Sequence, residues 1–149
     1  MRAVVQRVLH AHVDVDGVTL GRIERGLVAF VGAAKDDTQA DLDYCANKLV
    51  NLRVFPDESG KMTLSLGDIG GGLLVISQFT VFGDVRRGLR PSFEGAMEPT
   101  AAEASYDRFV AMCRATGVHV ETGRFRADMR VFVENDGPVT ILIDSRKSF

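Results

Sequence analysis

A chain of 149 residues, 46% hydrophobic and 26% charged, has the length and composition of one ordinary globular domain spanning residues 1–149. Its formal net charge of −2 excludes a protein that coats nucleic acid through bulk positive charge, although it permits a local basic site. Because it has no apolar run near the roughly 18 residues of a membrane span, no secretory signal and no CxxC motif, we expect a protein of the reducing cytoplasm without a membrane partner.

The N-terminal part of the chain predicts strands. Residues 2–15 alternate between apolar and polar side chains, which is typical of a long strand with one buried face. Asp16-Gly17 is a strong hairpin signal, so residues 18–23 are expected to form the returning strand. Residues 27–32 are almost entirely apolar, which favours a central strand covered on both faces.

Two helices are predicted. The first begins near Thr38, where Asp41 three residues later completes a capping box. The second runs from Pro99 to Ala115 and ends before Gly117. Helical spacing assigns the following residues to the buried faces: Leu42, Cys45, Ala46, Leu49 and Val50 in the first helix, and Ala104, Phe109, Met112 and Cys113 in the second.

Strands account for much of the remaining chain. A short strand at 53–55 ends at a proline, and a glycine run precedes a buried strand over 73–80. A polar, basic loop follows over 83–94, and residues 118–143 form a final hairpin or crossover. Together these elements predict an α+β fold, a strongly curved, barrel-like β-sheet with two main helices packed against it.

The segment Asn135-Asp136-Gly137-Pro138-Val139-Thr140 separates two runs, 129–134 and 139–143, that are both predicted to be buried strands. Proline has no N–H to donate within a ladder, and the preceding glycine adopts backbone angles that other residues avoid. Gly137-Pro138 therefore breaks the strand pairing and frees backbone groups to face something else. The alternative is an ordinary turn or an edge-strand proline.

The common catalytic and metal-binding motifs are missing from this sequence. Ser77 lies outside any G-x-S-x-G motif, and the glycines at 70–72 precede neither Lys-Ser/Thr nor a helix. His10 and His12 share one face of a strand, as a pair of metal ligands would, but no third ligand stands at a recognisable spacing. We therefore predict no metal and no cofactor.

Two polar segments are the candidate binding sites. Ser77, Gln78, Phe79 and Thr80 end an apolar strand abruptly, a common position for binding groups; the alternative is that they only satisfy the backbone. The second segment is a basic loop with an aromatic residue nearby, and it is either a phosphate-binding site or a solvated charged surface. Its predicted phosphate contacts are Arg86, Arg87 and Arg90.

Taken together, these segments resemble the D-aminoacyl-tRNA deacylase family along almost the whole chain. The residues that carry the resemblance are Met1–Val8, Ser77–Thr80, Arg90–Phe93, Glu121–Phe125, Ala127–Met129 and Asn135–Thr140. Two of these segments, S-Q-F-T and N-x-G-P-V-T, are the signatures of that family, and both are complete and in the family's order.

The resemblance implies a homodimeric hydrolase that cleaves the ester between a D-amino acid and the terminal adenosine of tRNA, and also cleaves glycyl-tRNA. It implies no cofactor and no DNA partner. The family's site residues carry over as a pocket lining of Ser77, Gln78, Phe79 and Thr80, a cis Gly137-Pro138 filter inserted from the partner subunit, Arg7 holding that loop outward, and Phe125 and Met129 flanking the adenine.

Several alternatives stay open at the level of sequence. Because an aminoacyl ester is already activated, positioning, backbone N–H groups and the substrate's ribose hydroxyl suffice for hydrolysis, whereas Thr80 as a nucleophile has no base near it in sequence. A non-catalytic RNA-binding module would use the loop over 86–90. A related deacylase with a trans Gly-Pro bond would accept L-amino acids, and a scaffolding protein would leave the Gly-Pro break and the polar strand end at 77–80 unexplained.

Overall fold

Strand β1 (Arg2–Val15) organises the sheet, because it pairs along both of its edges. In the computed structural model, which describes residues 1–149, one edge pairs antiparallel with β8 (Arg130–Asp144). The other edge pairs first with β3 (Gly26–Gly32) and then with β2 (Val18–Ile23). The predicted hairpin turn before β2 is confirmed, with both of its residues at positive φ.

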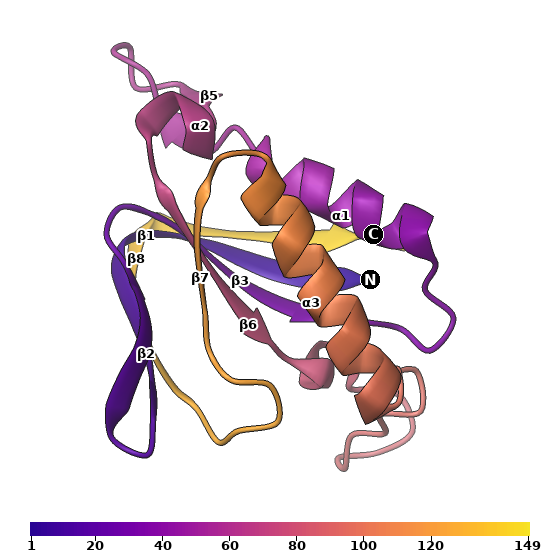
Figure 1. Ribbon diagram of the computed structural model, residues 1–149. Helices are drawn as coiled ribbons and strands as arrows, with labels where there is room; N and C mark the ends of the chain where they lie inside the picture. Colours follow the sequence, from indigo (N-terminus) through magenta and orange to yellow (C-terminus); the bar gives the residue numbers. More distant parts are fainter.

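The sheet is mixed and curves into a nearly closed barrel. Strand β6 (Gly72–Ser77) runs parallel to β3, and β7 (His119–Thr122) runs parallel to β6, in the order β2-β1-β3-β6-β7 with β8 beside β1 (Figure 1). The curvature brings β2 against β7: a Cβ on Gly21 would lie 2.6 Å from the carbonyl oxygen of Thr122. The predicted barrel-like α+β fold is therefore confirmed.

The two long helices, α1 (Gln39–Val50) and α3 (Pro99–Ala115), lie side by side on one face of the sheet (Figure 1). The predicted capping box is present, with the Thr38 N–H donating to Asp41 Oδ2 at 2.8 Å. The buried face of α1 is the predicted one, whereas α3 buries Ser105, Tyr106, Phe109, Val110 and Cys113. The prediction for Ala104 was wrong, because five residues before Phe109 is about 140° around a helix of 3.6 residues per turn, and Ala104 is exposed.

Two other sequence predictions are corrected by the structure. The strand predicted over 73–80 ends at Ser77, and Phe79–Phe82 form a 3₁₀ turn, η1. The two strands predicted around the Gly-Pro step are one element, β8, whose residues alternate in burial because only one face of β8 packs against the apolar clusters. Of the two arrangements left open for residues 118–143, the structure has the crossover, since β7 pairs with β6. The short strands β4 (Phe55–Pro56) and β5 (Met62–Leu64) pair beside the small helix α2 (Leu66–Ile69).

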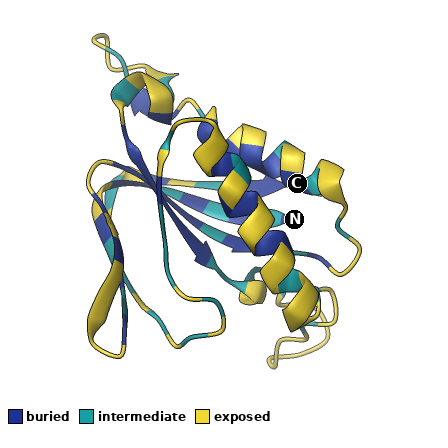
Figure 2. Ribbon diagram, in the orientation of Figure 1, coloured by how far each residue is buried: buried dark blue, intermediate teal, exposed yellow.

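Apolar side chains are buried on both faces of the central strands. The larger cluster lies between the sheet and the helices and contains Leu27, Leu73 and Phe109. A smaller cluster fills the inside of the barrel and contains Val8, Val28 and Leu74. Figure 2 shows the central strands buried and the outer faces of α1 and α3 exposed. This double burial explains why β3 and β6 have continuous apolar sequences.

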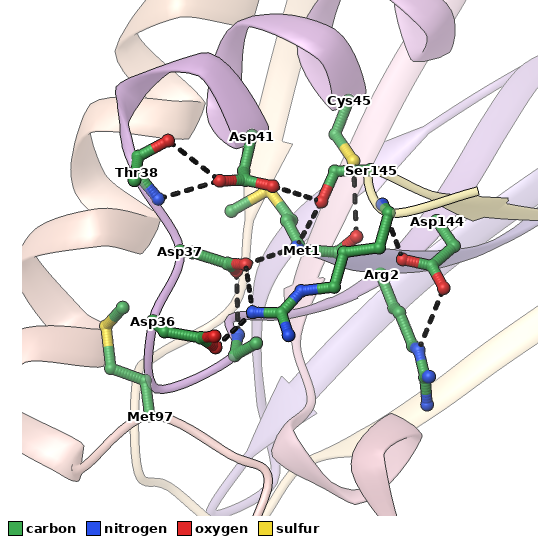
Figure 3. Close-up of polar contacts among 12 residues, drawn as sticks. Met1, Arg2, Asp36, Asp37, Thr38, Asp41, Cys45, Met97, Asp144 and Ser145 are labelled. Carbon is green, nitrogen blue, oxygen red and sulfur yellow. Dashed lines mark hydrogen bonds and ion pairs between the residues drawn. The ribbon is translucent and has the colours of Figure 1, made fainter. Parts of the chain in front are cut away.

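The two ends of the chain meet in a polar network at the start of α1 (Figure 3). The Met1 ammonium lies 2.7 Å from Asp37 Oδ1 and 2.7 Å from Ser145 Oγ. Ser145 Oγ also donates to Asp41 Oδ1 at 2.6 Å, and this bond is the main reason why the pKa of Asp41 falls to about 2. The network anchors the start of β1 to α1. None of the helices is both long enough and apolar enough to cross a membrane.

Candidate functional site

A cavity of about 610 Å³ opens where β3 and β6 end, beside the N-terminal end of α3 and the loop between β7 and β8. Figure 1 shows β6 running toward this end of α3. The volume lies within the roughly 300–1,000 Å³ of typical small-molecule sites, and 12 of the 18 lining residues are hydrophobic. Ser77, Gln78 and Phe79 line the cavity from one side, and Phe125 and Met129 line it from the facing loop.

The S-Q-F-T segment changes the direction of the chain at the edge of the cavity. The Gln78 N–H donates to the Val31 carbonyl at 2.8 Å, and this backbone hydrogen bond joins the segment to the end of β3. The Gln78 side chain then donates to Thr80 Oγ1 at 2.9 Å, and Phe79 packs edge-on against Phe93 with ring centroids 5.0 Å apart. Because a helical turn leaves its first N–H groups without intrahelical partners, the start of η1 offers backbone donors next to the cavity.

The facing wall is built around two side chains that the resemblance assigned to the adenine. The Phe125 ring packs against Tyr106 at 6.0 Å, and the Tyr106 hydroxyl donates to the Val75 carbonyl at 2.8 Å. A Cβ on Gly123 would lie 2.5 Å from Met129 Sδ, so the glycine leaves room for Met129 to turn toward the cavity. The structure therefore brings Phe125, Met129 and Ser77–Phe79 into one cavity, whereas Thr80 lies outside the cavity lining.

The Gly-Pro segment forms a bulge in β8. Gln6 pairs with Thr140 and Val8 with Asn135, so residues 136–139 of β8 stand opposite one residue of β1. The Gly137–Pro138 bond is cis. Inside the bulge, Asn135 accepts the Val139 N–H at 2.8 Å and donates to the Val139 carbonyl at 3.1 Å. The predicted break in strand pairing is thus present, and the Asn135 side chain replaces the hydrogen bonds that a neighbouring strand would make.

Arg7 is the residue of β1 that faces this bulge. Its side chain is buried; Nε donates to the Asp136 carbonyl at 3.0 Å and Nη1 donates to the Val54 carbonyl at 2.5 Å. Nε also lies 3.2 Å from the Asp136 carboxylate. A Cβ on Gly137, where φ is +139°, would lie 3.2 Å from Arg7 Nη2 and 2.7 Å from Val139 Cγ2. Only glycine fits between Arg7 and the rest of the bulge.

The bulge and the cavity do not meet within one chain. Gly137 and Pro138 are exposed, and neither lines the cavity. Arg7 contacts the bulge and likewise lies outside the cavity lining. The predicted site residues therefore form two groups in the structure, one at the cavity and one on β1 and β8.

The predicted phosphate contacts Arg86, Arg87 and Arg90 are exposed and lie outside the cavity lining. The guanidinium of Arg86 forms a fork with Asp84, with Nη2 2.5 Å from Oδ2. This hydrogen-bonded pair holds the pKa of Asp84 well below its usual range. The charge of Arg86 is thus compensated within the loop, which sequence reasoning overlooked although Asp84 is only two residues away.

Sequence reasoning also missed several residues of the cavity. They are Phe93, Met97, Glu98, Tyr106 and Arg126. Of these, Phe93 ends the Arg90–Phe93 segment that carried the resemblance and Arg126 follows Phe125 directly, whereas the other three had no local signal. The histidines have other neighbours: His10 lies 2.9 Å from Glu134, and His12 stacks on Phe132. No group of three or more His, Cys, Asp or Glu side chains is arranged to hold a metal ion.

Comparison with known proteins finds relatives that match nearly the whole chain. A family model described as D-Tyr-tRNA(Tyr) deacylase matches residues 4–144. Proteins named D-aminoacyl-tRNA deacylase from Sorangium cellulosum and Thermotoga petrophila are 71% and 57% identical, each over 100% of both chains. A solved structure titled c-Myc DNA Unwinding Element Binding Protein superimposes with a TM-score of 0.92 at 41% identity, over 97% of this chain and 98% of that one.

A second solved structure, titled as a probable eukaryotic D-amino acid tRNA deacylase, superimposes with a TM-score of 0.85. It covers 96% of this chain and 98% of its own, and at 20% identity it supports the fold alone. The family match spans nearly the whole chain, and the curated relatives share more than half of its residues from end to end. This chain therefore belongs to the D-Tyr-tRNA(Tyr) deacylase family of hydrolases.

Proposed function

We propose that this protein hydrolyses the ester bond of D-aminoacyl-tRNA, releasing the D-amino acid and tRNA, with residues 1–149 acting as one domain in the cytoplasm. The observation that carries the proposal is the apolar cavity of about 610 Å³ that ends at Ser77, Gln78 and Phe79. Such a site holds a flat base and an amino-acid ester while a few polar groups at one end orient them. The names of the curated relatives support the same substrate class.

Selection against L-amino acids is proposed to come from the Gly137-Pro138 bulge of a second copy of the chain. The bulge is exposed, rigidly held by Arg7 and Asn135, and outside the cavity of its own subunit. A two-fold dimer would place each bulge in the other subunit's cavity. Strand β8 supports this arrangement, since it pairs only with β1 and exposes Phe132 and Leu142.

A rigid wall of backbone beside the substrate Cα would select between D- and L-amino acids by steric exclusion. Exchanging the hydrogen and the side chain at Cα places the L side chain against the wall, whereas the D side chain points away from it. Glycine has no side chain to exclude, so glycyl-tRNA is expected to be a substrate. Proline and the hydrogen bonds around it supply the rigidity that such a wall requires.

Catalysis is proposed to use the substrate's own ribose hydroxyl rather than a protein nucleophile. The hydrogen-bond partner of Thr80 Oγ1 in the chain is the Gln78 amide, which donates to it and therefore does not act as a base. An aminoacyl ester is already activated, so positioning it and stabilising the oxyanion through backbone N–H groups at the start of η1 provide the main acceleration. The 2′-hydroxyl also distinguishes RNA from DNA at the terminal nucleotide.

The test is hydrolysis of matched D-tyrosyl-tRNA, L-tyrosyl-tRNA and glycyl-tRNA by the purified, metal-stripped protein. We expect loss of the D-tyrosyl and glycyl esters with the L-tyrosyl ester spared. Cleavage of the L-tyrosyl ester would instead indicate a deacylase without the D-specific filter. Salt-sensitive tRNA binding without cleavage of any ester would indicate an RNA-binding module. Duplex DNA serves as a binding control, since one solved neighbour is titled as a DNA-binding protein.

A further inference from the structure

The charged side chains of the cavity lining are Glu98 and Arg126. Glu98 is engaged at the start of α3, where its carboxylate accepts the Ala101 N–H at 2.6 Å and the Thr100 N–H at 3.2 Å. Arg126 is exposed and belongs to the loop between β7 and β8. It is thus the cation at the cavity that remains available to a ligand.

Arg126 is presented to the cavity by an unusual backbone. Its φ is +60°, in the left-handed region that disfavours side chains other than glycine and asparagine. The turn is closed by the Ala127 N–H, which donates to the Arg124 carbonyl at 3.3 Å. Residues other than glycine that are held in this region often lie at functional sites. The turn places Arg124 and Arg126 on either side of Phe125.

A second, more polar cavity of about 390 Å³ adjoins the first, because both are lined by Tyr106 and Phe125. Arg124 lines this second cavity, together with Arg114, which donates to the Val120 carbonyl at 3.4 Å. Arg126 therefore lines the first cavity and Arg124 the second, with Phe125 lining both.

The loop over 123–129, which we call the arginine loop, lies between β7 and β8. It contains two arginines and one aspartate, a net charge of +1, and is followed directly by Arg130 at the start of β8. The arginines of this protein that form ion pairs are Arg2, Arg7, Arg86 and Arg146, none of which lies in this loop. The loop over 84–94 has three arginines and two acids, also a net charge of +1, and one of its arginines is forked to Asp84. Of the two loops, the arginine loop is the one that places an arginine in the cavity lining, and neither of its arginines forms an ion pair.

We propose that the arginine loop binds the phosphodiester backbone of tRNA directly upstream of the terminal adenosine, with Arg126 on the phosphate that joins the last two nucleotides and Arg124 on the preceding one. An arginine fork matches the geometry of a phosphate and forms charge-assisted hydrogen bonds with it. Glu103 and Asp107 line the second cavity as well, so a phosphate bound there relies on Arg114 and Arg124 to offset their negative charge. This inference rests on the proposed function.

The experiment compares two minimal substrates, 3′-D-tyrosyl-adenosine, which has no phosphodiester, and 3′-D-tyrosyl-cytidylyl-adenosine, which has one. The variant is Arg126→Asn, because asparagine tolerates the left-handed region and removes the charge. The matched control is Arg108→Asn, another exposed arginine that lies outside the lining of both cavities and is not a predicted phosphate contact. For the wild type and the control we expect kcat/KM to be about tenfold higher with the dinucleotide ester.

Arg126→Asn should abolish this preference, measured within each variant as the ratio of kcat/KM for the two esters, and Arg126→Lys should restore part of it. Equal kcat/KM for the two esters in the wild type, or an unchanged preference in Arg126→Asn, would overturn the inference. Binding of uncharged tRNA gives a readout that does not depend on hydrolysis. There, Arg126→Asn should lower the slope of log K against log salt by about 0.7 relative to Arg108→Asn. Equal slopes would reject the phosphate contact, whereas the absence of ester hydrolysis with unequal slopes would reject only the proposed activity.

Discussion

Replacing Arg7 by methionine should destabilise the protein strongly, because the arginine is buried and three acceptors depend on it. Its side chain is 9% exposed. It donates hydrogen bonds to the carbonyls of Val54 and Asp136 and forms an ion pair with the Asp136 carboxylate. Leaving the buried Val54 carbonyl without a donor costs about 1–3 kcal/mol. Breaking a fully buried ion pair costs about 3–5 kcal/mol, which must be discounted here because the Asp136 side chain is 30% exposed.

These contributions give a loss of about 3–4 kcal/mol in the free energy of unfolding of Arg7→Met. For a domain of this size that corresponds to a fall of about 10 °C in Tm. The assay is urea unfolding followed by circular dichroism, in which the midpoint should fall while the m-value stays constant. The matched control is Asp136→Asn, which keeps both carbonyl bonds and loses only a partly exposed ion pair, about 0.5–1 kcal/mol.

The comparison of the two variants tests the reasoning. If Arg7→Met were no less stable than Asp136→Asn, the two carbonyl bonds would contribute nothing and Arg7 would not brace the bulge. Arg7→Lys adds a functional readout, since lysine keeps the charge without the fork that reaches both carbonyls. We expect Arg7→Lys to discriminate less well between D-tyrosyl-tRNA and L-tyrosyl-tRNA at a temperature where it is still folded.

Three further predictions concern catalysis, chirality and pH. Thr80→Ala should keep activity within about tenfold of the wild type, since at most one neutral hydrogen bond is lost; a fall to background would identify Thr80 as the nucleophile. Pro138→Ala should raise hydrolysis of L-tyrosyl-tRNA relative to D-tyrosyl-tRNA, and an unchanged ratio would remove Pro138 from the filter. Burial raises the pKa of Cys45 and Cys113 from 9.0 to about 12. The unfolded chain therefore loses these protons first, and the free energy of unfolding should fall between pH 9 and pH 12, by up to about 1.4 kcal/mol per pH unit and thiol. In urea unfolding, the double variant Cys45→Ala, Cys113→Ala should not show this fall in the free energy of unfolding. Identical pH profiles for the variant and the wild type would contradict the prediction.

Local structure could be predicted from the sequence because its causes lie within a few residues. The hairpin at Asp16-Gly17 follows from two residues that accept positive φ, and the start of α1 follows from the reciprocal bonds of Thr38 and Asp41. The buried face of α1 follows from helical spacing alone. The break at Gly137-Pro138 was also predictable, since neither residue suits a regular ladder.

Strand partners and the composition of the cavity were decided only by the tertiary structure. Nothing local in the sequence shows that β7 joins β6 while β8 returns to β1, because pairing depends on contacts between residues far apart in the chain. About half of β8 is exposed although its sequence predicted burial, because only one of its faces packs against the apolar clusters.

The residues of the candidate site likewise divide into those that the sequence predicts and those that only the tertiary structure brings together. The S-Q-F-T and Gly-Pro segments are visible in the sequence because unusual residues interrupt apolar strands. Their distances from the cavity, and the approach of Tyr106 and Arg126 to it, depend on how α3 and the arginine loop pack against the ends of β3 and β6. Short-range backbone preferences therefore determined the individual turns and helix ends, whereas long-range packing determined which of these residues share one cavity.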